Sequence, residues 1–194
     1  MAAPRVLVPL AEGFEELEAV TIIDLLRRAG VEVVSAGLQP GPVRGSRGTV
    51  ILPDDVLDNV IQQEFDMIAL PGGLPGADHL NNDPRLRQKL QDMARNNRTV
   101  AAICAAPKVL ASAGLLNGRK ATSYTGALDD AAGVELLNEP VVADGNIVTS
   151  RGPGTAMDFA LALIEQLLGP EKRMEVETPL LRPQSAPAAK RPPS

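Results

Sequence analysis

Short apolar runs alternate along the chain with longer segments in which apolar residues recur every three or four positions. The runs are typical of buried strands, and the recurrence is typical of helices that pack through one side. The expected strands are Arg5–Leu10, Val31–Ala36, Val43–Arg47, Thr49–Leu52, Phe65–Leu70, Thr99–Ile103, Ala121–Tyr124, Val141–Asp144 and Ile147–Ser150. The expected helices are Glu15–Arg28, Asp83–Asn96, Lys108–Ala113 and Thr155–Leu168.

This alternation, with continuous apolar central strands, predicts an α/β fold: a doubly wound, mostly parallel sheet with helices on both faces, in three layers. A length of 194 residues suits one such domain, which we place at residues 1–181. The remaining segment, 182–194, is basic, rich in Pro and Ala, and lacks large apolar residues. We expect it to be a disordered tail.

The composition excludes several classes of protein. One Cys and one His allow neither an internal disulfide nor a Cys/His zinc site, so no metal is expected. A net charge of −5 and four aromatic residues argue against specific nucleic-acid binding. No uncharged stretch approaches the roughly 20 residues that cross a membrane, and the N-terminus lacks a signal-peptide pattern. We therefore expect a cytoplasmic protein.

Three motifs follow expected strands, at the edge of the sheet where doubly wound folds bind ligands. They are Gly13–Glu18, Pro71–Gly73 and Cys104–Pro107. Cys104 joins a buried strand to a helix start, a layout like that of a nucleophile elbow. Helix amides there are expected to lower the pKa of the thiol. A buried structural cysteine fits the local pattern too.

The other two motifs also allow two interpretations. Glu18 is a candidate for the inward edge of its helix, although acidic residues in a first turn commonly serve the helix dipole. Gly72 and Gly73 permit close approach of a ligand and can donate N–H groups to an oxyanion, but a double glycine after a strand also simply makes a turn. His79 lies in a polar stretch and is expected at the surface.

Together these segments resemble the DJ-1/PfpI superfamily, in particular its DJ-1/ThiJ/YajL-like branch. The matching segments are LAEGFEELE (10–18), DLLRRAG (24–30), LPGG (70–73), AAICAAP (101–107) and TSRGPGT (149–155). The resemblance implies a flavodoxin-like fold and a homodimer. It implies that Cys104 is the nucleophile and that Glu18 is a protonated partner of its thiolate, with the Gly73 and Ala105 amides as oxyanion donors. Among basic residues, Arg27, Arg28 and Arg47 match positions near the dimer interface or the site entrance.

Two positions depart from relatives. Some members have a His after the nucleophile helix, where this chain has Tyr124, a poor base at neutral pH. The protease-like branch has a His directly after the nucleophile, where this chain has Ala105. A Cys–His protease is therefore not expected, because the adjacent base is missing.

Three functions follow as hypotheses. The first is a glyoxalase or deglycase that acts on α-oxoaldehydes such as methylglyoxal, or on their adducts with thiols and amines, without a metal or organic cofactor. The second is an oxidative-stress sensor and redox-regulated chaperone in which Cys104 becomes a sulfinate. The third is a catalytically silent dimeric binding module, which Tyr124 in place of a His would favour.

Overall fold

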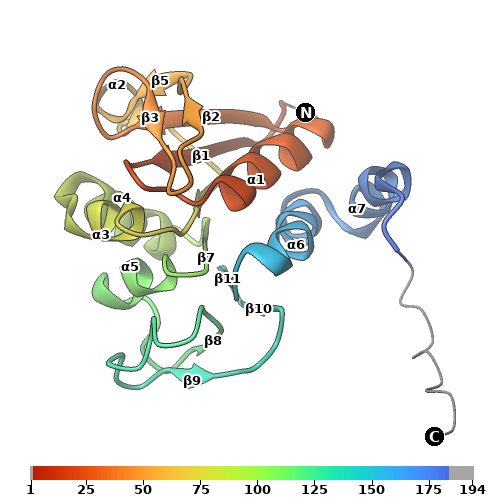
Figure 1. The fold of residues 1–194 in the computed structure, drawn as a ribbon. Helices are drawn as coiled ribbons and strands as arrows, with labels where there is room; N and C mark the ends of the chain where they lie inside the picture. The colour runs from red at the N-terminus through yellow and green to blue at the C-terminus, as the bar shows by residue number, and fades with distance from the viewer. Residues whose placement is uncertain (1, 184–194) are drawn as a thin grey trace, which may run out of the picture.

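The computed structural model describes residues 2–183 (Figure 1). The strands are β1 (Arg5–Leu10), β2 (Glu32–Gly37), β3 (Val43–Arg44), β4 (Val50–Ile51), β5 (Asp55–Val56), β6 (Met67–Leu70), β7 (Thr99–Ile103), β8 (Lys120–Ala121), β9 (Glu135–Leu136), β10 (Val141–Asp144) and β11 (Ile147–Ser150). The helices are α1 (Glu16–Arg28), α2 (Leu57–Val60), α3 (Gly76–Asn82), α4 (Pro84–Arg95), α5 (Pro107–Ser112), α6 (Ala156–Leu168) and α7 (Pro170–Glu177). Two 3₁₀ turns cover Pro153–Thr155 and Thr178–Leu180.

Seven strands form one sheet in the order β10-β11-β7-β6-β1-β2-β5. All neighbours are parallel except β10 and β11, which form an antiparallel hairpin. This confirms the predicted doubly wound, mostly parallel sheet. The chain runs from β1 to β2 on one side and later returns to β6 on the other, so strand order reverses between β1 and β6. Ligand sites in such sheets lie at this reversal, beyond the carboxyl ends of the strands.

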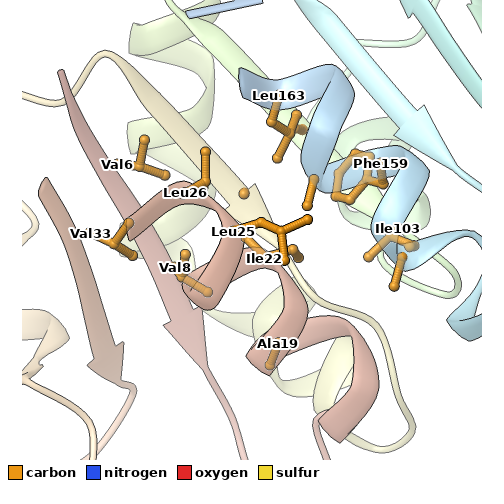
Figure 2. Close-up of a cluster of buried hydrophobic side chains, with 14 of the residues drawn as sticks. Val6, Val8, Ala19, Ile22, Leu25, Leu26, Val33, Ile103, Phe159 and Leu163 are labelled. Carbon is orange, nitrogen blue, oxygen red and sulfur yellow. The ribbon is translucent and has the colours of Figure 1, made fainter. Parts of the chain in front are cut away.

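Helices cover both faces of the sheet (Figure 1). On one face α1 packs against α6, and Figure 2 shows Ile22 and Leu25 of α1 directed toward Phe159 and Leu163 of α6. On the other face α2, α3, α4 and α5 enclose a second apolar cluster. The inner strand β7 is buried along its whole length, because both clusters press on it. Its end is therefore held rigidly.

Some expected elements differ in extent or position. The segment expected as an edge strand at 43–47 forms only β3, which pairs with β4 in a separate hairpin. The strand expected at 121–124 shortens to β8, which pairs with β9 outside the main sheet. Gly45 interrupts the first segment, which follows Pro42, and Thr122 and Ser123 make the second segment polar, so neither offers an apolar run long enough to join the sheet.

Helix α1 buries only part of its apolar surface. Leu17 and Val20 are 62% and 47% exposed, while Ala19, Ile22 and Leu26 are buried. Helical spacing alone does not tell which of two neighbouring apolar stripes meets the core. The helix therefore carries a second apolar stripe that faces outward.

The packed region reaches the last described residues. Arg182, which we assigned to the tail, forms ion pairs with Asp158 of α6 and Glu177 of α7. The rest of the predicted tail, 184–194, lies outside the described residues. Between residues 2 and 183, no helix is both long and apolar enough to cross a lipid bilayer.

Candidate active site

Cys104 lies at the turn between β7 and α5 and has a left-handed backbone, with φ of 64°. An L-residue other than glycine is strained in this region, so its surroundings must impose it. The N–H of Cys104 donates to the carbonyl of Ser150 at 3.0 Å, and its carbonyl accepts the N–H of Tyr124 at 2.8 Å. Both backbone groups are thus fixed, and the side chain of the 8% exposed cysteine turns to the edge of the sheet.

Glu18 reaches the same edge from the first turn of α1. The side chain of Glu15 caps the helix by accepting the Glu18 N–H at 2.8 Å. The Glu18 side chain is completely buried, and its Oε2 accepts the N–H of Gly72 at 2.7 Å. Its other oxygen, Oε1, is buried and has no hydrogen-bond partner among residues 2–183. A buried carboxyl with a single backbone N–H donor is held in place but poorly stabilised as an anion.

The two glycines after β6 make this approach of side chains feasible. A Cβ on Gly72 would lie 2.7 Å from Cys104 Cβ and 2.8 Å from Glu18 Oε2, so both side chains converge on its Cα. A Cβ on Gly73 would lie 2.4 Å from the nitrogen of Glu15, and Gly73 has φ of 89°. The site therefore depends on the absence of side chains at two adjacent positions.

The Glu18 carboxyl and the Cys104 thiol interact directly and shift each other's pKa. Burial raises the pKa of Glu18 to about 7, against the stabilising N–H of Gly72. Burial also raises the pKa of Cys104 to about 12, and the negative charge of Glu18 and its contact with the thiol add to the rise. The amides of Gly73 and Ala105 act on the sulfur in the opposite direction.

The rise in the pKa of Cys104 contradicts the fall that we expected from the helix start. α5 has only six residues, and burial beside a carboxylate outweighs its amides. Two of the three effects that raise this pKa come from Glu18 and vanish when Glu18 holds the proton. The two groups therefore titrate as a pair, in which a charged sulfur requires a protonated Glu18.

The predicted donor residues separate into two groups. The amides of Gly73 and Ala105 lie near enough to the Cys104 sulfur to lower its pKa, and their role as oxyanion donors stays a prediction. Gly72, which we had placed with them, instead gives its N–H to Glu18. Gly72 thus positions the carboxyl, because one N–H cannot serve both groups at once.

The accessory candidates are spread more widely. Tyr124 is bonded through its backbone to Cys104, and its 56% exposed side chain lies against Gly152. Arg47 lies on the β3–β4 hairpin, which is tied to the start of α1. Arg28 lies ten residues after Glu18, about 15 Å further along the helix, and pairs there with Asp24.

The remaining candidates add no further group to the site. His79 is exposed on α3 and is not among the residues that surround Cys104, as expected. In the described part of the chain, no three His, Cys, Asp or Glu side chains gather in a metal-binding group. Arg151 was not singled out from the sequence, although it directly follows β11, the parallel neighbour of β7.

Comparison with known proteins places the chain in a family. The family model described as "DJ-1/PfpI family" matches residues 4–166. This chain belongs to the DJ-1/PfpI family. A zebrafish (Danio rerio) relative, "Parkinson disease protein 7 homolog", is 42% identical over 186 residues, which cover 93% of this chain and 98% of the relative. The Caenorhabditis elegans "Glutathione-independent glyoxalase DJR-1.2" is 37% identical, with coverage of 93% and 98%.

Solved structures of the DJ-1/PfpI family share the fold. "Toxoplasma gondii DJ-1, oxidized" superposes with a TM-score of 0.89 at 41% identity, covering 92% of this chain and 98% of that one. The match extends over nearly the whole described chain. The family resemblance inferred from the motifs is therefore confirmed.

Proposed function

We propose that this DJ-1/PfpI protein is a cysteine-dependent glyoxalase or deglycase that acts on α-oxoaldehydes or their early adducts with thiols and amines. The observation that carries the proposal is the buried carboxyl of Glu18 against the Cys104 thiol, with the Gly73 and Ala105 amides directed at the sulfur. A relative that bears the name of a glutathione-independent glyoxalase supports it. Nucleophile, proton carrier and oxyanion donors together suffice for this reaction.

The reaction starts with transfer of the thiol proton to Glu18. The sulfur of Cys104 then adds to the aldehyde carbon of methylglyoxal, and a C–S bond forms as the C=O π electrons move to oxygen. The amides of Gly73 and Ala105 stabilise the negative charge on that oxygen. The oxyanion takes the proton from Glu18, which gives a hemithioacetal and returns Glu18 to its carboxylate form.

Glu18 then moves a proton between adjacent carbons. With the carboxylate as base, the former aldehyde carbon loses its hydrogen as a proton, and the electron pair moves toward the neighbouring carbonyl to give an enediolate. The neighbouring carbon receives this proton back from Glu18 while the hydroxyl proton passes to the neighbouring oxygen, so the first carbon is oxidised and the second is reduced. The product is a thioester of lactate on Cys104. Water cleaves the C–S bond, releases lactate and restores the thiol, so methylglyoxal and one water balance lactate.

Substitution of the two residues tests the mechanism. Cys104→Ser and Glu18→Gln are expected to lower kcat/KM for methylglyoxal by about 10³-fold or more and about 10²-fold, because each removes a step of the reaction. The assay measures lactate, and Glu171→Gln on exposed α7 is the matched control. Wild-type rates in Cys104→Ser would overturn the proposal.

Oxidation of Cys104 is a second candidate function, as a stress sensor with chaperone output. A Toxoplasma gondii relative is described as oxidized, and the amides around this sulfur suit the oxygens of a sulfinate. Mass spectrometry after mild peroxide is expected to find two added oxygens on Cys104 before methionines are oxidised. A thiol that persists while the methionines oxidise would exclude this function.

The outward apolar stripe of α1 supports a second copy of this chain as the partner, in a homodimer. Leu17 and Val20 of α1 are exposed, as are Val50 and Leu52 at the hairpin tied to the same helix. Exposed apolar residues on neighbouring elements typically mark a protein interface. Leu17→Glu is expected to shift the molar mass in light scattering from dimer to monomer. A wild-type monomer would contradict the proposal.

A further inference from the structure

A cavity outside the Cys104 site opens at the carboxyl ends of β1 and β2. It encloses about 570 Å³ between the loop after β1, the loop after β2 and the junction of α3 with α4. Cavities of this size hold small molecules in many proteins, and doubly wound sheets bind ligands beyond the carboxyl ends of their strands. Neither Cys104 nor Glu18 lines it, so the reaction proposed above gives it no role.

The walls of this cavity are bonded to one another. The N–H of Leu38 donates to the carbonyl of Leu10 at 3.1 Å, and the guanidinium of Arg85 donates to the carbonyl of Leu38 at 3.3 Å. The N–H of Arg44 donates to the Glu12 carboxylate at 3.1 Å, which ties the loop after β1 to β3. Because each wall is fixed by another, the cavity exists before a ligand binds, as is usual for small-molecule sites.

The inner surface of the cavity is apolar. Leu10, Ala11 and Val43 line it and are buried, and Leu38 lines it and is partly buried. Leu10 ends β1 and Leu38 directly follows β2, so the sheet itself supplies the base of the cavity. A ligand gains affinity here by covering this surface with a hydrocarbon body.

The charges of the lining are balanced at one position and unbalanced at another. Arg85 forms ion pairs with Asp83 and Asp58, so its charge is neutralised within the protein. Glu12 also lines the cavity, but among residues 2–183 it forms no ion pair, and a backbone N–H is the donor to its carboxylate. A carboxylate beside apolar surface, without a cation of its own, suits a positively charged group on a ligand.

We propose that this cavity binds an organic amine that has an apolar body. The ammonium group pairs with the Glu12 carboxylate, and the apolar body packs against Leu10 and Leu38. An anion is disfavoured, because the charge of Glu12 has no counterion in the lining. The site uses none of the reacting residues, so the inference is independent of the glyoxalase or deglycase reaction.

Three probes of similar size test the role of charge. 3-Phenylpropylamine, 3-phenylpropanol and 3-phenylpropionate share a phenyl ring and a three-carbon chain, and they are positive, neutral and negative. Binding is followed by ¹H–¹⁵N NMR titration at fixed pH and ionic strength. The amides of Ala11 and Asn82 at the cavity are expected to shift, while those of Gly73 and Ala105 beside Cys104 stay in place. The amine is expected to bind about fivefold more tightly than the alcohol, and the propionate more weakly than both.

Two variants separate the charge from the apolar surface. Glu12→Gln is expected to lower the affinity for the amine about fivefold and to leave that for the alcohol unchanged, because the amide oxygen still accepts the N–H of Arg44. Leu38→Ala is expected to lower the affinity for all three probes about threefold, because it removes apolar surface that they share. Glu171→Gln, on exposed α7, is the matched control. Thermal melts of all variants confirm folding.

The result that would overturn the site is equal binding of the amine and the alcohol to the wild-type protein. An equal loss of amine binding in Glu12→Gln and Glu171→Gln would overturn it too. Shifts confined to amides around Cys104 would place the amine at the reactive cysteine and reject the cavity. Cys104→Ser keeps the cavity and lacks the nucleophile, so it is expected to bind the amine as the wild type does.

Discussion

Two glutamates in the first turn of α1 have opposite surroundings. Glu16 faces the β3–β4 hairpin, where the Ser46 hydroxyl and the N–H groups of Arg47 and Thr49 donate to its carboxylate. Glu18, two residues on, is fully buried and accepts one N–H, that of Gly72. One helix turn thus points one carboxyl toward a polar loop and the other into the sheet edge.

Their pKa values diverge accordingly. Partial burial alone would raise the pKa of Glu16, but the hydrogen bonds from the hairpin outweigh it and the pKa falls. Burial dominates at Glu18 and raises its pKa to about 7. The comparison teaches that the supply of donors, and not the residue type or its place in a helix, decides which carboxyl can carry a proton at neutral pH.

The largest expected effect on stability is at Glu18. A carboxyl with a raised pKa stabilises the fold fully below its unfolded pKa of about 4.5, and the stabilisation is lost as the pH rises toward 7. Glu18→Gln has no such group, so at pH 8 we expect it to be more stable than wild type by roughly 3 kcal/mol. The gain should shrink below about 1 kcal/mol at pH 5.

Urea denaturation at the two pH values measures this difference. Because the same variant is expected to lose most of its activity, stability and function would change in opposite directions. A Glu18→Gln protein that is less stable than wild type at both pH values would show that Glu18 is held as a stabilising anion, and would remove the contrast with Glu16.

The glycine opposite each glutamate sharpens the comparison. Gly72→Ala would press a methyl group against Cys104 Cβ, Glu18 Oε2 and the carbonyl of Ile103, and is expected to cost about 2–3 kcal/mol. Gly45→Ala meets only the Glu16 side chain, at 2.5 Å, and that side chain can turn toward solvent. We expect its cost to stay below about 1 kcal/mol.

Thermal or urea denaturation of the two alanine variants gives both costs. Lactate assays add a second contrast, since Gly72→Ala displaces the reacting pair and Gly45→Ala does not touch it. Equal losses in the free energy of unfolding would mean that the edge of the sheet accommodates an added methyl group as easily as the surface hairpin does.

The sequence predicted where the residues of this site lie better than it predicted their pKa shifts. Apolar runs located β1, β7 and the β10–β11 hairpin, and the order of elements implied that Glu18, Gly73 and Cys104 meet at one edge. The direction of the pKa shift at Cys104 was wrong, because it depends on the burial of two side chains from distant segments. Local helix signals cannot report such burial.

The outward stripe of α1 and the role of Gly72 were missed for a related reason. Leu17 and Val20 have the same spacing as core residues, and only packing against α6 shows which stripe is buried. Gly72 and Gly73 are the same residue type, and only the position of α1 beside the end of β6 determines that the N–H of Gly72 donates to Glu18. Choices between equivalent neighbours are made by tertiary contacts.

The smallest expected effect is at Glu16. Glu16→Gln keeps the shape of the side chain but replaces one acceptor oxygen with a donor that faces N–H groups, so the hairpin is expected to lose about 1 kcal/mol of stability. A lowered pKa stabilises above the unfolded value near 4.5, and the contribution disappears as the pH falls through the folded value. The difference in stability from wild type should therefore be present at pH 7 and shrink below about pH 4, opposite in sign to that at Glu18.

Hydrogen exchange of the Arg47 and Thr49 amides at pH 7 directly measures the hydrogen bonds that they donate to Glu16. Unchanged exchange in Glu16→Gln would show that the hairpin is held by its own β3–β4 pairing, and the contrast would then rest on Glu18 alone.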